Sequence, residues 1–292
     1  MRRFTSHANQ LYFASTSHTN IFIAPTPSIA GDKAVIPEIQ AGLERGVLTL
    51  TISRADKKNA LTNDMYGALA DAIGNASTDA SVRVVLIQAD GDSFTAGNDI
   101  GEFAAQATGN APKERHVVRF LHSLANATVP IVAAVQGKAV GVGTTMLLHC
   151  DYVVLADDAQ LITPFVNLAL VPEAASSYLL PLRIGHARAF EMFSLGDPLP
   201  ADTAVAWGIA NRTVPVDQLR AEGRRIAEKI ATKPSGSLTA MKRLMREAEK
   251  LVAQMDAESS TFVERLRSAE AKEAFTAFAQ KRQPDFSRIA KQ

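Results

Sequence analysis

Short apolar runs alternate with helix-like segments over the first two thirds of the chain, and this alternation limits the possible folds more than any other feature. Four of these runs have the length and period of largely buried strands. The predicted strands are Val47–Ser53, Val84–Ile87, Ile131–Val135 and Tyr152–Ala156. Between them, apolar residues recur at helical spacing, first in a segment that begins at Thr62 or Asn63 and then around Leu121. Strands that alternate with helices predict an α/β domain.

The pattern changes after about Thr213. From Asp217 to Arg282 nearly every apolar position follows a helical period, with a break at Pro234 and Ser235. We therefore expect a disordered extension over residues 1–34, an α/β core over 35–232 and a helical region over 233–292. In the last region, apolar residues recur at a spacing that would cover a neighbouring surface, which predicts a role in oligomerisation. These residues are Leu238, Met241, Leu244 and Met245.

Composition excludes several classes of function. The 31 basic and 30 acidic residues leave a formal charge of +1, so no global field attracts nucleic acid or anionic lipid. No apolar stretch approaches the roughly 18 residues of a membrane span. The single cysteine, Cys150, rules out an intramolecular disulfide and fits a reducing compartment, so we expect a buried thiol and a cytoplasmic protein.

The N-terminal segment allows two interpretations. Arg2, Arg3, many serines and threonines, and no acid before Asp32 are the composition of a transit peptide. A disordered extension, or a start codon upstream of the real one, gives the same composition and is favoured because no clean amphipathic helix is visible. Organellar targeting stays open, although the final residues, 289–292, are not a peroxisomal signal.

Two glycine-containing turns each follow a buried strand and precede a helix. They are Phe94–Ile100 and Gly137–Thr145, and the apolar stretch Met146–Leu148 belongs to a helix that opens near Gly143. Backbone N–H groups at a helix start are unpaired and lie at the positive end of its dipole, so each turn is able to hold an anion. Facing each other, the two turns would form an oxyanion hole, but a glycine turn alone is an ordinary connection.

Other motifs are absent from the sequence. Gly141-x-Gly143 lacks the third glycine of a dinucleotide-binding fingerprint, since Met146 stands there. There is no Walker A loop, no metal-ligand spacing and no G-x-S-x-G elbow. Four histidines without a carboxylate or cysteine at ligand spacing are expected to pack or to lie at the surface. They are His116, His122, His149 and His186.

An ordered series of motifs resembles the crotonase (enoyl-CoA hydratase/isomerase) superfamily from about Val47 to the Phe278–Arg282 tail. The motifs are Asn59-Ala60-Leu61, Phe94–Ile100, Gly137–Thr145 with Cys150-Asp151, Leu170–Glu173, and Trp207-Gly208-Ile209 with Val214-Pro215. The resemblance implies a spiral core of repeated ββα units with a C-terminal helical region. It also implies an acyl-CoA substrate, trimers or hexamers, and no metal or separate cofactor, because CoA is part of the substrate.

The resemblance assigns roles to particular residues. The family binds the thioester oxygen with two backbone N–H groups, which here fall on Asn98 and Val142; such donors stabilise an enolate by about 3 to 4 kcal/mol each. The CoA channel is implied to be lined by Asn59, Ala60, Leu61, Ala96, Gly97, Asn98, Asp99, Ile100, Gly141 and Val142. Lys57, Lys58 and Lys281 are candidate phosphate contacts, although isolated lysines are usually only solvated.

The acid/base positions separate two reactions of the family. Hydratases carry two glutamates where this chain has Thr145 and Phe165, neither of which exchanges a proton near neutral pH. Glu173 instead matches the catalytic base of peroxisomal-type Δ3,Δ2-enoyl-CoA isomerases, and a 1,3-proton shift needs one carboxylate. Apolar neighbours, including Leu168 and Leu170, would raise the pKa of this base.

Other interpretations of Glu173 stay open at this point. A glutamate after proline commonly begins a helix and favours its dipole. A specialised hydratase, another enolate-forming acyl-CoA enzyme, or an idle acyl-CoA binder would also fit the family. An idle binder has no reason to keep a lone carboxylate at this position, which favours the isomerase.

Overall fold

The computed structural model describes residues 36–102 and 114–289. The chain divides into two units, residues 1–34 and 35–292. The predicted disordered extension and its transit-peptide alternative lie outside the described residues. All the strands and helices that the structure describes belong to the second unit.

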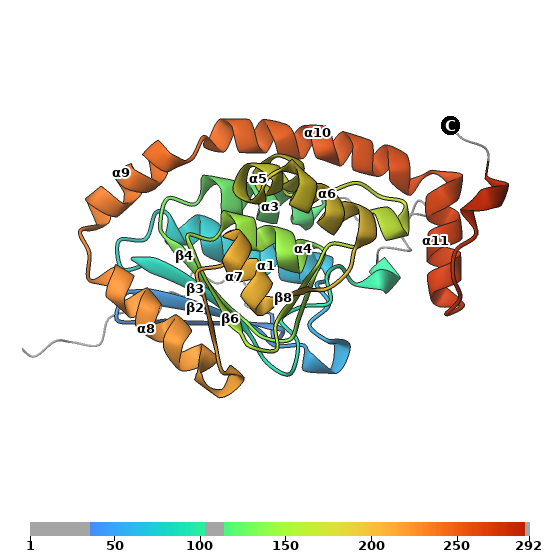
Figure 1. Ribbon diagram of the computed structural model, residues 1–292. Helices are drawn as coiled ribbons and strands as arrows, with labels where there is room; N and C mark the ends of the chain where they lie inside the picture. Colours follow the sequence, from blue (N-terminus) through green and yellow to red (C-terminus); the bar gives the residue numbers. More distant parts are fainter. Residues whose placement is uncertain (1–35, 103–113, 290–292) are drawn as a thin grey trace, which may run out of the picture. The chain divides into compact units, whose positions relative to one another are not determined.

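The core of this unit is a six-stranded sheet (Figure 1). Its first two strands form an antiparallel hairpin, and all later neighbours are parallel, as expected where strands are connected by helices. The strands, in their order across the sheet, are β1 (Ile39–Glu44), β2 (Val47–Ile52), β3 (Val84–Ala89), β4 (Ile131–Val135), β6 (Tyr152–Ala156) and β9 (Arg212–Val214). The four predicted strands and the α/β class are confirmed.

A second sheet carries the turns that matter for function. It has three short strands, β5 (Lys138–Val140), β7 (Gln160–Ile162) and β8 (Leu199–Pro200). The chain passes from β4 to β5 at Gln136 and Gly137 and from β6 to β7 at residues 157–159. Each of these two main-sheet strands is thus followed by a strand of the small sheet, which is the ββα repeat that the resemblance implies.

Helices cover both faces of the main sheet, so its central strands are apolar on both sides. Val84 and Leu86 of β3 pack against α8 (Leu219–Ala231), whereas Val85 and Ile87 belong to the cluster on the opposite face. That face is covered by α1 (Asn63–Ala76) and α3 (His116–Asn126), and Figure 1 shows α8 on the other side of the sheet. The continuous apolar run in β3 therefore follows from its burial on both faces.

The first helix begins where the sequence predicts. Thr62 is the N-cap of α1, and its hydroxyl oxygen accepts a hydrogen bond from the Met65 N–H at 3.3 Å. Met65, Leu69 and Ile73 are fully buried along one side of the helix. The helix expected near Gly143 begins one residue earlier, as α4 (Val142–Thr145), and tightens into a 3₁₀ turn, η2 (Met146–His149).

The remaining helices complete the unit. They are α5 (Ser176–Ile184), α6 (His186–Leu195), α7 (Ala201–Trp207), α9 (Ser235–Met245), α10 (Ala248–Leu266) and α11 (Ala269–Ala279). The predicted break at Pro234 and Ser235 is the start of α9. The long helix α10 runs across the molecule beside α3 and α5, as Figure 1 shows in orange and red.

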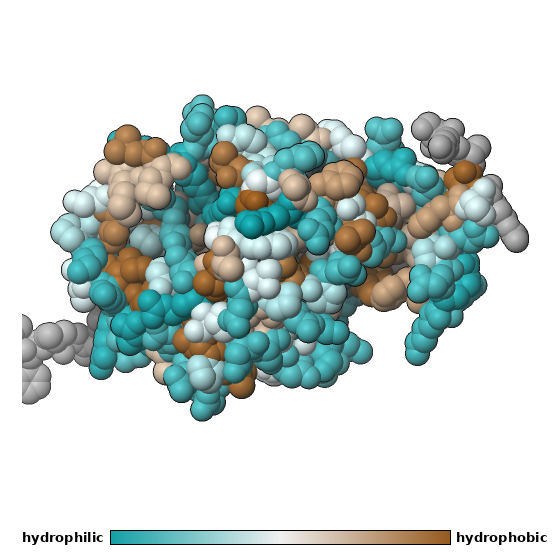
Figure 2. Space-filling view, viewed as in Figure 1, coloured by the Kyte–Doolittle hydropathy of each residue, from teal (hydrophilic) through white to brown (hydrophobic). Residues whose placement is uncertain are grey.

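Two observations concern the surface of the described residues. Figure 2 shows apolar side chains gathered over α9, where Leu244 is 86% and Met245 79% exposed.

Across the two described ranges, no helix combines the length and the apolar character that crossing a bilayer requires.

Candidate active site

A pocket lies between α1, α3, α10 and the loop that follows Gly97. It brings together Asn98 and Glu173, two of the predicted site residues, from segments far apart in sequence. Part of its wall comes from α10, which carries Ser259 and Phe262. The lining residues are Leu61, Asn63, Tyr66, Asn98, Asp99, Glu102, Arg115, Val117, Val118, Leu121, Glu173, Ser259 and Phe262.

The two glycine turns lie side by side, as the oxyanion-hole prediction requires. Thr95 and Ala139 form a parallel bridge, in which the Val140 N–H donates to the Thr95 carbonyl at 3.0 Å. Gly97 has a φ of +88°, and a Cβ at this position would lie 3.0 Å from the Val140 carbonyl oxygen. A glycine is therefore needed for the first turn to approach the second so closely.

The backbone geometry leaves one N–H free on each turn. Leu61 bonds to the Gly97 carbonyl and, through its own carbonyl, to the Asp99 N–H, so the intervening Asn98 N–H points away from this pairing. Val142 is the first residue of α4, where an N–H has no acceptor within the helix. Among the described residues, neither N–H has a hydrogen-bond acceptor. Asn98 lines the pocket, whereas Val142 is 1% exposed and does not.

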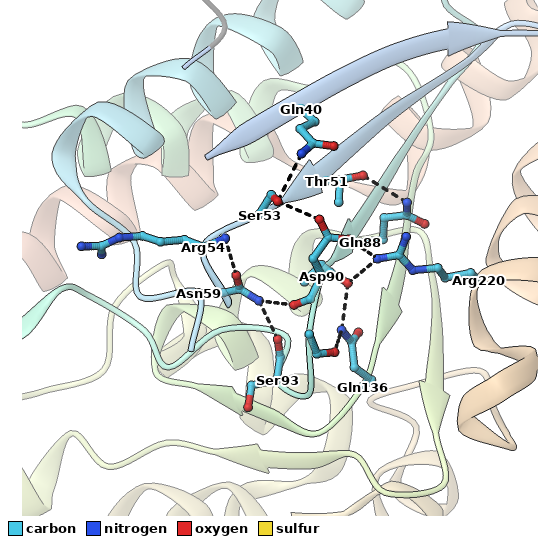
Figure 3. Close-up of polar contacts among 12 residues, drawn as sticks. Gln40, Thr51, Ser53, Arg54, Asn59, Gln88, Asp90, Ser93, Gln136 and Arg220 are labelled. Atoms are coloured by element: carbon cyan, nitrogen blue, oxygen red, sulfur yellow. Dashed lines mark hydrogen bonds and ion pairs between the residues drawn. The ribbon is translucent and has the colours of Figure 1, made fainter. Parts of the chain in front are cut away.

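The side chain of Asn59 points into the protein and forms hydrogen bonds with backbone groups. Its side-chain amide donates to the carbonyls of Asp90 and Ser93 at 2.7 and 2.8 Å, and its Oδ1 accepts from the Arg54 N–H (Figure 3). The residue is fully buried, with a φ of +55°. Its side chain therefore fixes the loop that carries Ala60 and Leu61, of which Leu61 lines the pocket.

The other predicted channel residues are placed in different ways. Asp99 also lines the pocket, but it pairs with Arg54 at 2.7 Å and accepts from the Gly101 N–H. Burial opposes ionisation of Asp99, yet the hydrogen bond and charge of Arg54 hold the pKa of its carboxyl below the usual range. Ala96 and Ile100 are exposed.

The three candidate phosphate contacts, Lys57, Lys58 and Lys281, are all exposed. Lys58 forms an ion pair with Asp92 at 2.7 Å. An exposed pair of this kind is worth little in stability, so Lys58 is not committed to a structural role.

Glu173 lies in an irregular segment and not at a helix start. The following helix, α5, begins three residues later, and no acidic residue lies in its first turn. The interpretation of Glu173 as a helix-start carboxylate is therefore wrong. Pro172 does not open a helix here, because Ala174 and Ala175 adopt left-handed conformations with φ of 62° and 54°.

The carboxyl of Glu173 has the properties of a base at neutral pH. Burial raises its pKa to about 7, and the nearby Glu258 carboxylate acts in the same direction. The Thr145 hydroxyl donates to its Oε1 at 2.7 Å and lowers the pKa, because the bond favours the charged form. Part of the residue faces the pocket, so the carboxyl is half-buried yet accessible to a ligand.

The two hydratase positions have other uses. Thr145 is buried in α4, where its hydroxyl orients Glu173. Phe165 belongs to an apolar cluster with Leu170, Phe262 and Leu266. One position thus orients Glu173, and the other belongs to an apolar cluster.

Sequence reasoning missed Tyr66. It is 3% exposed, lines the pocket, and donates from its hydroxyl to the Asn98 Oδ1 at 2.6 Å. Burial, followed by the charges of Glu173 and Glu102, raises its pKa well above the usual value, so it keeps its proton. In the sequence it follows Met65 on an amphipathic helix, a position that gives no signal beyond packing.

Cys150 is buried, which confirms the predicted buried thiol, and burial raises the pKa of this thiol to about 12. Within the described ranges, no group of three histidine, cysteine or acidic side chains could hold a metal ion.

The chain is similar to several known proteins. The sequence profile described as enoyl-CoA hydratase/isomerase matches residues 42–289. The 1,2-epoxyphenylacetyl-CoA isomerase of Escherichia coli K12 is 33% identical, with 85% of this chain and 98% of the relative covered. The enoyl-CoA delta isomerase 2 of Rattus norvegicus is 36% identical, with 80% and 61% covered. A crystal structure of an enoyl-CoA hydratase/isomerase from Pseudoalteromonas atlantica has a TM-score of 0.81 at 43% identity, with 85% and 99% covered.

Proposed function

The chain belongs to the enoyl-CoA hydratase/isomerase family, and from that premise we propose that it moves a double bond from position 3 to position 2 of an enoyl-CoA. The observation that carries the proposal is the contact between Glu173 and Thr145. A hydroxyl stands at the first hydratase position, and it orients a carboxyl group that has a pKa near neutrality. Neither hydratase position thus carries a carboxylate, and Glu173 is left as the proposed base.

One carboxylate is sufficient for the chemistry. Glu173 takes a proton from C2, and the electron pair of that C–H bond delocalises into the thioester carbonyl to give a dienolate. The free N–H groups of Asn98 and Val142 are the proposed donors to the resulting oxyanion. The protonated Glu173 then returns the proton at C4, and the remaining double bond lies between C2 and C3.

The same pocket disfavours the two alternative functions, a hydratase and an idle acyl-CoA binder. A hydratase must position and activate water, and the positions that its glutamates would occupy hold Thr145 and the apolar Phe165. A carboxylate with a raised pKa beside a ligand pocket also disfavours an idle binder. Side-by-side assays of the purified protein with 3-enoyl-CoA and 2-enoyl-CoA test the proposal. Isomerisation should greatly exceed hydration, and the reverse order would refute it.

The pH dependence of isomerisation should follow the ionisation of Glu173. The base is active when deprotonated, so kcat/KM should rise with pH through about 7 and then level off. At two pH units below the pKa, about 1% of the plateau rate should remain. Initial rates between pH 5 and 9, followed by absorbance of the conjugated product, measure this profile.

Thr145→Val separates the contribution of the hydroxyl. Since the Thr145 bond lowers the pKa of Glu173, its loss should move the profile to higher pH. Thr145→Ser keeps the hydroxyl and is the matched control, with a profile near that of the wild type. An unmoved profile in the valine variant would mean that the rate does not report on Glu173.

We also propose that the chain assembles as a trimer or hexamer through the apolar side of α9. Met241, Leu244 and Met245 are each more than half exposed, which is unusual for a helix without a partner surface. Light scattering at micromolar concentration should give a trimer or hexamer mass, and Leu244→Glu should reduce it. A monomeric wild-type protein would contradict the assignment.

A further inference from the structure

The peptide unit between Ala174 and Ala175, just after Glu173, is hydrogen-bonded at its carbonyl and at its N–H to ionisable side chains. The Ala174 carbonyl accepts a hydrogen bond from His149 Nε2 at 2.7 Å. The Ala175 N–H donates to Glu258 Oε2 at 2.6 Å. His149 is the last residue of η2 and Glu258 lies on α10, so two separate elements hydrogen-bond to the same peptide unit.

This peptide needs external support. Ala174 and Ala175 both have positive φ, which costs of order 1–3 kcal/mol for each residue without a glycine. Both alanines are buried, at 1% and 0% exposure, so water cannot satisfy their backbone groups. The contacts of His149 and Glu258 therefore offset a conformation that the local sequence does not favour.

The protonation of His149 is fixed by its neighbours. Arg246 donates to Nδ1 at 2.8 Å, so Nδ1 accepts and the proton of the neutral ring lies on Nε2. Burial, with the added charges of Arg246, Arg183 and Lys242, lowers the pKa of His149 to about 3. The imidazole is thus neutral across the working pH range and always presents its N–H to the Ala174 carbonyl.

Glu258 makes several contacts besides the Ala175 N–H. Its Oε1 accepts from the Ser177 N–H at 3.0 Å and from the Ser177 hydroxyl, which also accepts from Gln254 at 3.0 Å. These groups belong to the first turn of α5, where the N-cap, Ala175, offers no side-chain oxygen. Glu258 is 6% exposed, and its carboxylate replaces the missing cap.

We propose that Glu258 and His149 are positioning residues, which hold the Ala174–Ala175 peptide and thereby fix the carboxyl of Glu173 against Thr145. The inference rests on the proposed function, because it assigns a purpose to the precise placement of that base. Without the hydrogen bonds of His149 and Glu258, the peptide is free to leave its left-handed conformation, and the Glu173 carboxyl then moves away from the substrate carbon. Glu258 also places a negative charge near Glu173. The other polar groups near the Glu173 carboxyl are the Thr145 hydroxyl on α4 and the Tyr66 hydroxyl on α1.

Glu258→Gln tests whether the hydrogen bonds of Glu258 position Glu173. The amide cannot accept at both of its ends, so one of the Ala175 and Ser177 N–H groups loses its acceptor. We expect kcat to fall by about 10-fold to 100-fold with KM changed less than about 3-fold, as for a misplaced base. Because a negative charge is removed, the pH profile should move to lower pH, which loss of stability alone would not cause.

Glu264→Gln is the matched control, since it removes an exposed carboxylate from the same helix. Its kcat and pH profile should equal those of the wild type. Should Glu258→Gln fail to fold, Ser177→Ala removes one partner of the carboxylate with less disruption and should lower kcat about 3-fold.

The outcomes separate this inference from the proposed function. A wild-type protein that does not isomerise 3-enoyl-CoA refutes the function. If the wild type isomerises and depends on Glu173, while the Glu258 variant keeps the wild-type kcat and pH profile, the positioning role is wrong and the function stands. An unchanged kcat for Ser177→Ala decides in the same way when the Glu258 variant is unfolded.

Discussion

Replacing Glu173 with glutamine should lower the rate of 3-enoyl-CoA isomerisation by about 100-fold to 10,000-fold, the usual cost of losing a general base. Glutamine has nearly the same shape and keeps an oxygen that accepts from the Thr145 hydroxyl. It cannot take a proton from C2 or return one at C4. Acyl-CoA affinity should therefore stay near the wild-type value, and absorbance of the conjugated product should measure the loss of rate.

Stability provides the control for this variant. The pKa of Glu173 is about 7 in the fold against a usual value of 4.5, so the folded state favours the protonated form. The wild type then loses stability as pH rises from 4.5 through 7, by about 3 kcal/mol in total. The glutamine variant avoids this loss, and urea unfolding at pH 8 should find it more stable than the wild type.

An undiminished rate of isomerisation in the Glu173→Gln protein would refute the mechanism. Equal or lower stability at pH 8 would instead mean that the carboxyl is better solvated than its surroundings indicate. The two measurements are independent, because one depends on proton transfer and the other on burial.

Gly137→Ala should destabilise the fold by about 4 kcal/mol or more, among the largest effects of a single substitution. A Cβ on this residue would lie 1.9 Å from the Asp92 carbonyl oxygen and 3.3 Å from the Ser93 Cα. The loop cannot move aside easily, because Asn59 holds the Asp90 and Ser93 carbonyls and Gln136 holds that of Gly91 (Figure 3). The positive φ of Gly137, +53°, adds backbone strain.

Gly74→Ala is the matched control for this substitution. Gly74 is exposed in α1, and a Cβ there meets no atom within 4 Å. Alanine should stabilise the helix by roughly 0.5–1 kcal/mol. Urea unfolding of both variants compares them, and a Gly137→Ala protein as stable as the wild type would contradict the close approach of Gly137 to Asp92 and Ser93.

The strands and helices of the core were predictable because their periods are local. Val84–Ile87 is apolar at every position because β3 is buried on both faces, and Thr62 is recognisable as a cap from its own side chain. These signals lie within a few residues of one another. The sequence pattern therefore predicts the α/β class without any knowledge of distant contacts.

The site was less accessible to such reasoning. Glu173 was identified through family resemblance, and its alternative as a helix start was wrong because two left-handed alanines follow it. Asn59 was assigned to a ligand channel, whereas its side chain bonds within the protein. Glu258 was missed because it meets Ala175 across 83 residues of sequence, a pairing that no local pattern encodes.

The position of α10 has a consequence for the order in which the protein becomes competent during synthesis. A ribosome releases the two glycine turns, Thr145 and Glu173 first, and α10 emerges only later. Until it docks, the pocket lacks the wall formed by Ser259 and Phe262, and the peptide behind Glu173 lacks its Glu258 contact. A nascent chain that ends before α10 therefore contains Glu173 without the contacts that position it, so by the proposed mechanism it cannot act on acyl-CoA until α10 has been synthesised and has docked.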